Sequence, residues 1–130
     1  MRAVLDTSVL IGDEAPPAGI ESSISAVSIA ELHFGLLVAT DDDARSIRAA
    51  RMGLIEARYP DPLPLDDRVA REWGRLQAAV VQRGGKPRKR MADLAIAATA
   101  SVHDAVLITR NVKDFKIVGD LVDVVSPSGP

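Results

Sequence analysis

The hydrophobic positions along the chain fall into two kinds of pattern. Short apolar runs, typical of buried strands, alternate with longer segments in which apolar residues return every three or four positions, typical of helices. This alternation favours a parallel sheet covered by helices on both faces. We therefore expect an α/β fold with three layers, α/β/α, around a central parallel sheet of about five short strands. The expected strands are Arg2–Leu5, Ser25–Val27, Leu63–Leu65, Val106–Ile108 and Val122–Val125.

The helical segments are bounded by caps and by glycine or proline. Acidic residues at a helix start and glycine or proline after its end mark these limits. Gly84–Arg90 is expected to be a loop because of its glycine and proline content. The first expected helix, Thr7–Ile11, is cut short by Gly12 and Pro16-Pro17. The next three are Ser28 to about Ala39, a helix that starts at Asp41-Asp42-Asp43 and runs towards Arg58, and a helix capped by Asp66 or Asp67 whose apolar face holds Val69, Trp73, Leu76 and Val80. The last is Ala92–His103.

The composition of the chain excludes some classes of protein but does not indicate a function by itself. The chain has 130 residues, 47% of them apolar and 3% aromatic, which suits one domain with an aliphatic core. The net charge of −2 excludes a strong global attraction for nucleic acid, and without cysteine there is no disulfide or thiol nucleophile. The start lacks a signal-peptide pattern, and no apolar run is long enough to span a bilayer. We expect a cytoplasmic protein with no membrane contact.

Four acidic residues stand where such a fold would bring them together. Asp6 follows the first strand, Glu31 falls in the first turn of the helix from Ser28, Asp93 opens the alanine-rich helix, and Asp114 follows the strand at 106–108. In open parallel sheets, ligands bind beyond the carboxyl ends of the strands. Crowded carboxylates resist joint ionisation, so they need a counter-charge, for which a hard divalent cation is the usual choice. The chain is thus a candidate metal-dependent hydrolase.

Each acid also has a purely local explanation. Asp6 could cap the turn that follows, and Glu31 could form a capping box with Ser28. Asp93 could only complement its helix dipole, and Asp114 could only cap a short turn. The conjunction of four such positions favours a shared site over four separate caps.

The neighbours of the acids divide in the same way. Asn111 could bind a metal through its carbonyl or be a turn residue, and Ser8 and Thr109 could orient carboxylates or cap locally. A basic cluster immediately before Asp93 could deliver phosphates to the acids, or could be a solvated loop. The candidate RNA-binding residues are Lys86, Arg88, Lys89, Arg90 and Arg110.

Four motifs, in this order and spacing, make the chain resemble the PIN-domain family, and more narrowly the VapC-type ribonuclease toxins of prokaryotic toxin–antitoxin pairs. The resemblance covers nearly the whole chain, with residues 1–126 as one PIN-like domain and 127–130 as a loose tail. The motifs are Val4–Ser8, Ser28–Leu32, Arg90–Ala98 and Thr109–Phe115.

The resemblance implies an endoribonuclease that uses Mg²⁺ or Mn²⁺, forms a homodimer and is inhibited by a small VapB-like antitoxin. By resemblance, the metal-binding and catalytic carboxylates would be Asp6, Glu31, Asp93 and Asp114, with Asn111 at or beside the fourth position. The chain departs from the family in its first helix, which looks short. Only 24 residues separate Asp6 from Glu31, which bears on antitoxin docking more than on chemistry.

Two other functions are compatible with an acidic strand edge. A phospho-receiver-like regulatory domain could use Asp66, Thr109 and Lys113, although receivers need adjacent acids after the first strand, where this chain has Thr7-Ser8. A PIN-like scaffold that no longer cuts RNA is the third possibility, and the intact acids argue against it.

Overall fold

A computed structural model describes residues 1–12 and 14–129 of the protein. Its centre is a parallel sheet of four strands in the order β2-β1-β3-β4. The strands are β1 (Arg2–Leu5), β2 (Glu21–Ile24), β3 (Val106–Ile108) and β4 (Val124–Val125). The parallel sheet is therefore confirmed, with four strands in place of the expected five or so. Leu63 makes only an isolated bridge to Ser25, and β4 is shorter than Val122–Val125.

The expectation for the second strand and the helix after it was wrong by several residues. Ser25 ends the extended segment and caps the helix, because its side chain accepts a hydrogen bond from the Val27 N–H at 3.0 Å. The strand thus occupies 21–24, where only Ile24 is fully buried. As the edge strand, β2 tolerates Ser22 and Ser23, and its weak apolar pattern concealed it.

The helices follow the caps seen in the sequence. Asp41 and Asp66 accept hydrogen bonds from the third residue of their helices, at 2.8 and 3.0 Å. A 3-10 segment, η2, covers 112–118, where no helix was expected. The helical elements are α1 (Thr7–Leu10), α2 (Ala26–Leu37), α3 (Asp42–Arg58), α4 (Asp67–Gln82), η1 (Pro87–Arg90), α5 (Met91–Val102) and η2 (Val112–Val118).

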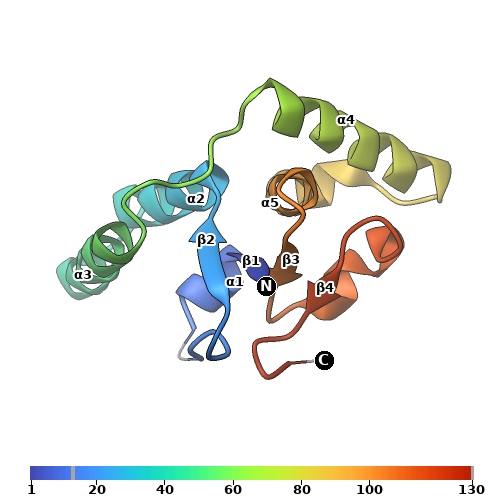
Figure 1. The fold of residues 1–130 in the computed structure, drawn as a ribbon. Coiled ribbons are helices and arrows are strands. Elements are labelled where there is room, and N and C mark those ends of the chain that lie inside the picture. The colour runs from blue at the N-terminus through green and yellow to red at the C-terminus, as the bar shows by residue number, and fades with distance from the viewer. Residues whose placement is uncertain (13, 130) are drawn as a thin grey trace.

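The strands bury opposite faces in two separate apolar clusters. Val4 and Leu107 pack with residues of α4, α5 and η2, whereas Leu5 and Ile108 pack with residues of α1 and α3. Figure 1 shows α2 and α3 together on the β2 side of the molecule, and α4 lying along α5. The three-layer α/β/α arrangement is confirmed. Helix α5 is its most deeply buried helix, with seven consecutive buried residues from Leu94 to Ala100.

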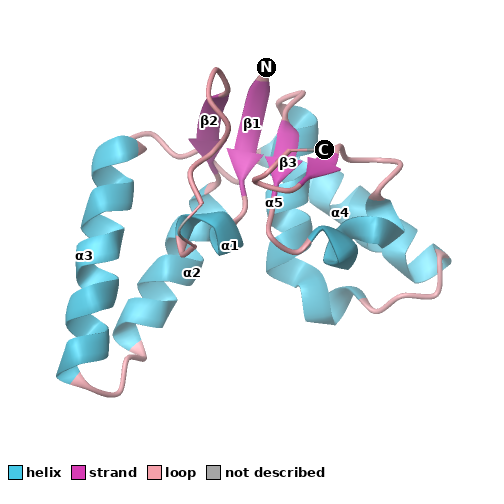
Figure 2. Cartoon of the chain, turned by 90° about the horizontal axis from the view of Figure 1, so that it is seen from below, coloured by secondary structure: helices cyan, strands magenta, loops and turns pink. Residues whose placement is uncertain are grey.

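The strand order creates the crevice that open parallel sheets use for ligands. The chain passes from β1 to β2 on one side and later returns to β3 on the other side of β1. The carboxyl ends of β1 and β3 therefore lie side by side at a topological switch point. Figure 2 shows the strand arrowheads directed towards α1 and away from the edge where the N-terminus lies.

In the part of the chain that the structure describes, no helix combines the length and the apolar character that a bilayer crossing needs.

The Ser126 carbonyl accepts a hydrogen bond from the Gly129 backbone N–H at 3.0 Å, so a tight turn forms near the end of the described chain. The proposed tail at 127–130 stays a prediction, and its last residue, Pro130, lies outside the described residues.

Candidate active site

Asp6 anchors the site at the switch point. It is the residue after β1 and is only 3% exposed. Its Oδ2 atom accepts hydrogen bonds from Ser8 at 2.7 Å and from Thr109 at 2.9 Å. Its side chain makes no helix-cap bond, so the local capping explanation does not account for it. One hydroxyl from α1 and one from the residue after β3 thus fix one buried carboxylate, as expected for Ser8 and Thr109.

Glu31 reaches the site from the second turn of α2, not from the first turn as the sequence suggested. Ser28 lies inside the helix and is fully buried, so it cannot form the capping box with Glu31. Instead, the Thr7 hydroxyl lies 2.6 Å from Glu31 Oε1 and 2.9 Å from the Ser28 hydroxyl. Thr7, which sequence reasoning did not single out, therefore links α1 to α2. Its position directly after Asp6 was the available signal.

Asp93 and Asp114 share one arginine. Asp93 lies in the first turn of α5 and Asp114 in the first turn of η2. The Arg90 guanidinium binds both Asp114 oxygens, at 2.8 and 3.0 Å, and lies 3.7 Å from Asp93 Oδ2. These two carboxylates raise the pKa of Arg90 above its ordinary value, with the Asp114 hydrogen bond the larger cause. Arg90 is therefore an internal counter-charge of the acidic cluster.

The electrostatics show that all four acids share one field. The pKa of Asp93 is raised from 3.8 to about 6, first by burial and then by the charges of Asp6 and Glu31. Asp114 raises it further, while Arg90 opposes the rise. A carboxyl group responds in this way only to charges nearby, so Asp93 lies within reach of the other three acids. The fold thus brings together the four carboxylates that are scattered along the sequence.

In residues 1–12 and 14–129, no group of three or more His, Cys, Asp or Glu side chains is arranged to hold a metal ion. The oxygens of these acids are instead taken up by Thr7, Ser8, Thr109 and Arg90. The donor set itself suits a hard divalent cation, because it supplies only oxygen ligands and an excess of negative charge. The cation expected from the sequence therefore stays a prediction.

The choice between Asn111 and Asp114 as the fourth ligand stays a prediction, but the two residues differ in position. Asn111 is exposed, and among the described residues only its backbone is engaged. Its N–H donates to the Thr109 hydroxyl at 3.0 Å, and its carbonyl accepts the Asp114 N–H at 2.9 Å. Asp114 is partly buried and acts on the charge of Asp93. This arrangement favours Asp114.

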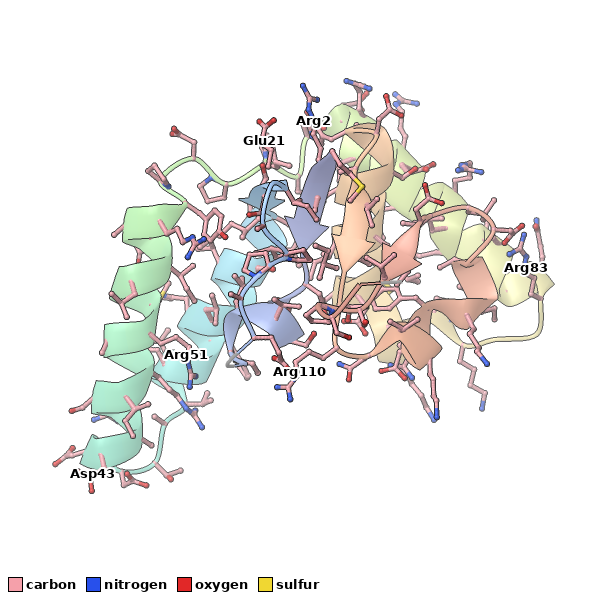
Figure 3. The ribbon with its side chains drawn as sticks, turned by 60° about the horizontal axis from the view of Figure 1, so that its bottom comes forward. Arg2, Glu21, Asp43, Arg51, Arg83 and Arg110 are labelled. Atoms are coloured by element: carbon pink, nitrogen blue, oxygen red, sulfur yellow. The ribbon has the colours of Figure 1, made fainter. Side chains whose placement is uncertain are left out.

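The basic residues separate into different surroundings. Lys86, Lys89 and Arg90 line a hollow beside Asp93 and Asp114, whereas Arg88 does not. Arg110 pairs with Glu14 at 3.2 Å, and Figure 3 shows it near α1 and far from Arg83 at the end of α4. Their role in RNA binding stays a prediction. The same hollow is lined by two residues of η2 that sequence reasoning missed as RNA ligands, Lys113 and Lys116.

The receiver-like arrangement does not form. Asp66 caps α4 through its bond to the Val69 N–H, so it is not part of the cluster around Asp6 and Thr109. Lys113 lines the same hollow as Asp93 and Asp114. The three residues that a receiver-like site would need, Asp66, Thr109 and Lys113, therefore do not form one cluster.

Comparisons with known proteins agree with this geometry. A family model described as PIN domain matches residues 3–121. Ribonuclease VapC4 of Mycobacterium tuberculosis is 34% identical over 126 residues, which cover 92% of this chain and 93% of that protein. Ribonuclease VapC5 of the same organism is 37% identical over 115 residues, covering 83% and 82%.

Solved structures give the same result. A member of the VapBC family of toxin–antitoxin systems, VapBC-5 from Mycobacterium tuberculosis, is similar with a TM-score of 0.81 and 34% identity, covering 96% of each chain. VapBC-1 from nontypeable Haemophilus influenzae shares the fold, with a TM-score of 0.75, 22% identity and coverage of 98% and 99%.

The fold and the site together define an α/β/α domain with clustered carboxylates at the switch point of a parallel sheet. Within that class, the chain belongs to the PIN domain family, and its relatives assign it to the VapC branch.

Proposed function

We propose that the protein is an endoribonuclease that hydrolyses RNA phosphodiester bonds and acts as the toxin of a VapBC-type pair. The observation that carries this proposal is the shared field of four carboxylates at the carboxyl edge of the sheet, seen in the raised pKa of Asp93. The relatives are named ribonucleases, which supports RNA as the substrate.

We propose Mg²⁺ or Mn²⁺ as the cofactor, held by Asp6, Glu31, Asp93 and Asp114, with Asn111 beside them. A bound divalent ion supplies a water of lowered pKa and neutralises charge on the phosphate. The protein's own part is to position the oxygens. Ser8 and Thr109 orient Asp6, Thr7 orients Glu31, and Arg90 limits the repulsion between Asp93 and Asp114.

A side-chain nucleophile is not required by this arrangement. The chain has no cysteine, and its two histidines lie outside the acidic cluster, His33 on the exposed surface of α2 and His103 at the C-terminal cap of α5. The attacking group is therefore water, and the four acids account for the chemistry without a covalent intermediate.

A candidate surface for protein partners lies on α2 and α3. Helices α2 and α3, with the C-cap of α2, expose large apolar side chains, and contiguous exposed apolar surface often marks a protein–protein contact. We propose that apolar contacts of this kind serve the antitoxin and a homodimer partner, since the structures similar to this chain are VapBC toxin–antitoxin systems. The exposed side chains are Phe34, Leu37, Val38, Ile47 and Leu54.

The experiment is cleavage of a labelled RNA by the purified protein with Mg²⁺, with Mn²⁺ and with EDTA. We expect cleavage only with metal, and a loss of at least about 100-fold for Asp93→Asn, because the site loses a charged ligand. The matched control is Asp61→Asn, which removes one carboxylate from the exposed loop between α3 and α4. Asp61→Asn should cleave like the unaltered protein.

Cleavage by Asp93→Asn at the original rate would contradict the assignment of the site, since no other cluster in the described chain offers this chemistry. Metal-independent cleavage would contradict the proposed cofactor. Phosphorylation of the protein by a small phosphodonor, without RNA cleavage, would favour the receiver-like alternative.

A further inference from the structure

All four lysines of the chain line a single hollow. The sequence contains lysine only at 86, 89, 113 and 116, and its other twelve cationic side chains are arginines. Lys86 and Lys89 come from the segment that joins α4 to α5, and Lys113 and Lys116 come from η2. Two segments separated by the whole of α5 thus converge on a space of about 530 Å³.

The charge of the hollow is opposite to that of the molecule. Its lining holds five cations, the four lysines and Arg90, against two carboxylates, Asp93 and Asp114, so the local balance of five minus two is +3. The chain as a whole carries −2. Arg90 is engaged by both acids, whereas none of the four lysines takes part in an ion pair among the described residues. Four exposed ammonium groups therefore remain available to an anion.

The hollow continues directly into the acidic cluster. Asp93 and Asp114 belong to its lining and to the proposed active site, so both spaces share one wall. A polyanion with regularly spaced charges can bind the lysines and still place another phosphate at the acids. A free anion or a short acidic side chain has no such reason to bind at this boundary.

The size of the hollow suits a nucleotide. The volume lies in the ordinary range for small-molecule sites, roughly 300 to 1,000 Å³. The lining includes an apolar wall of Val80 and Ile117, and a Cβ on Gly85 would come within 2.7 Å of Ile117 and 2.8 Å of Val80. Glycine therefore allows the loop to close against this wall.

The lining also limits how the bases could be recognised. Phe115, the only aromatic residue in the lining, is 2% exposed and cannot serve as a stacking platform. Base stacking on aromatic side chains is the usual means by which single strands are gripped through their bases. The available contacts are instead charge contacts to phosphate, which carry no sequence information.

We infer that the four lysines form a subsite for the RNA backbone next to the scissile bond, and that this subsite binds single-stranded RNA regardless of its bases. The inference rests on the proposed function and extends it, because it assigns the lysines to substrate positioning and not to chemistry.

The first experiment measures binding of a fluorescent 12-nucleotide RNA by anisotropy, over a range of salt concentrations and in an Asp6→Asn background that does not cut. Lys113→Gln with Lys116→Gln should weaken binding by roughly 10- to 30-fold near 0.1 M salt. It should also lower the slope of log affinity against log salt by about 1.4, because each phosphate contact on a single strand contributes about 0.7. A second RNA of different base composition should lose affinity to the same extent.

The matched control removes two positive charges elsewhere. Arg51→Gln with Arg71→Gln changes net charge equally, on α3 and α4 away from the hollow. This pair should leave the salt slope unchanged. Because the four lysines are exposed, their replacement should not unfold the protein, and circular dichroism checks this.

A second experiment uses the fact that all four lysines line the same hollow. Acetylation of lysine removes its charge and should abolish RNA binding, whereas reductive methylation keeps the charge and should retain it. Bound RNA should protect all four lysines from acetylation, as read by mass spectrometry, with the Met1 amino group as the unprotected reference.

The outcomes separate the two levels of the argument. If the lysine variants bind RNA with an unchanged slope while the unaltered protein still cleaves RNA, the subsite is refuted and the proposed function stands. If the unaltered protein neither binds nor cleaves RNA, both are refuted. If the lysine variants bind RNA normally but escape antitoxin inhibition, the hollow takes an acidic protein segment and the RNA subsite is refuted.

Discussion

Replacing Asp93 by asparagine should stabilise the metal-free protein at neutral pH while destroying the site. The pKa of Asp93 is raised from 3.8 to about 6, chiefly by burial and by Asp6 and Glu31. The folded protein therefore holds a proton at this carboxyl more tightly than the unfolded chain does. Ionisation of Asp93 therefore lowers the free energy of unfolding. This loss of stability is absent below about pH 4, grows between about pH 4 and pH 6, and is complete above about pH 6.

The size of this penalty follows from the shift. Each unit of pKa corresponds to about 1.4 kcal/mol, so a shift of this size gives at most roughly 3 kcal/mol. The Asp93 side chain is 31% exposed, and its contact with Arg90 at 3.7 Å is lost in the variant. With solvent screening and that loss, we expect a net gain of about 1 to 2 kcal/mol in the free energy of unfolding at pH 7.5.

The assay is urea denaturation in EDTA at pH 7.5 and at pH 4.5, for the unaltered protein, Asp93→Asn and the exposed control Asp61→Asn. The gain should shrink by more than half at pH 4.5, and the control should change by less than about 0.5 kcal/mol at either pH. Mg²⁺ should stabilise the unaltered protein but much less the variant. If Asp93→Asn is less stable than the unaltered protein at pH 7.5 in EDTA, the crowding of the four acids has been misjudged.

Two further predictions concern the support of the site and of the core. Thr109→Val should lower the free energy of unfolding by about 1.5 to 3 kcal/mol, because the buried Asp6 carboxylate loses a hydrogen bond of 2.9 Å. Thr109→Ser keeps the hydroxyl and should restore most of this stability, as measured by urea denaturation. Leu76→Ala should lower the free energy of unfolding by about 3 kcal/mol, because Leu76 is fully buried between α4 and the sheet. Val81→Ala, at a position 59% exposed, should change the melting temperature little. Equal losses of stability for the two variants would contradict the core described above.

The sequence predicted those parts of the fold that local chemistry determines. Asp41 and Asp66 cap α3 and α4 because short carboxylates compete well for free N–H groups. The second strand was misplaced because β2 lies at the edge, where burial on one side imposes little apolar pattern. Segment η2 escaped notice because its seven residues fit no 3.6-residue periodicity and are held by Phe115 and Val118 in the core.

The site was predictable in its residues more than in its contacts. Positions after parallel strands are known before the structure, so Asp6, Ser8 and Thr109 could be grouped from the sequence. The pairing of Arg90 with Asp114 could not, because it depends on how η2 turns back towards α5. For the same reason the gathering of all four lysines in one hollow became visible only in three dimensions.

The hydrogen bond between Thr109 and Asp6 joins residues 103 positions apart, and the four acids span residues 6 to 114 of a 130-residue chain. A ribosome that has finished α4 has made Asp6 and Glu31 but neither Asp93 nor Asp114. Contacts of such long range form late, because much chain must be ordered before they close. A growing chain that lacks Asp93 and Asp114 therefore cannot carry the assembled site. If the protein is a toxin, its activity appears only once residue 114 has been made and packed, when an antitoxin already present can meet it.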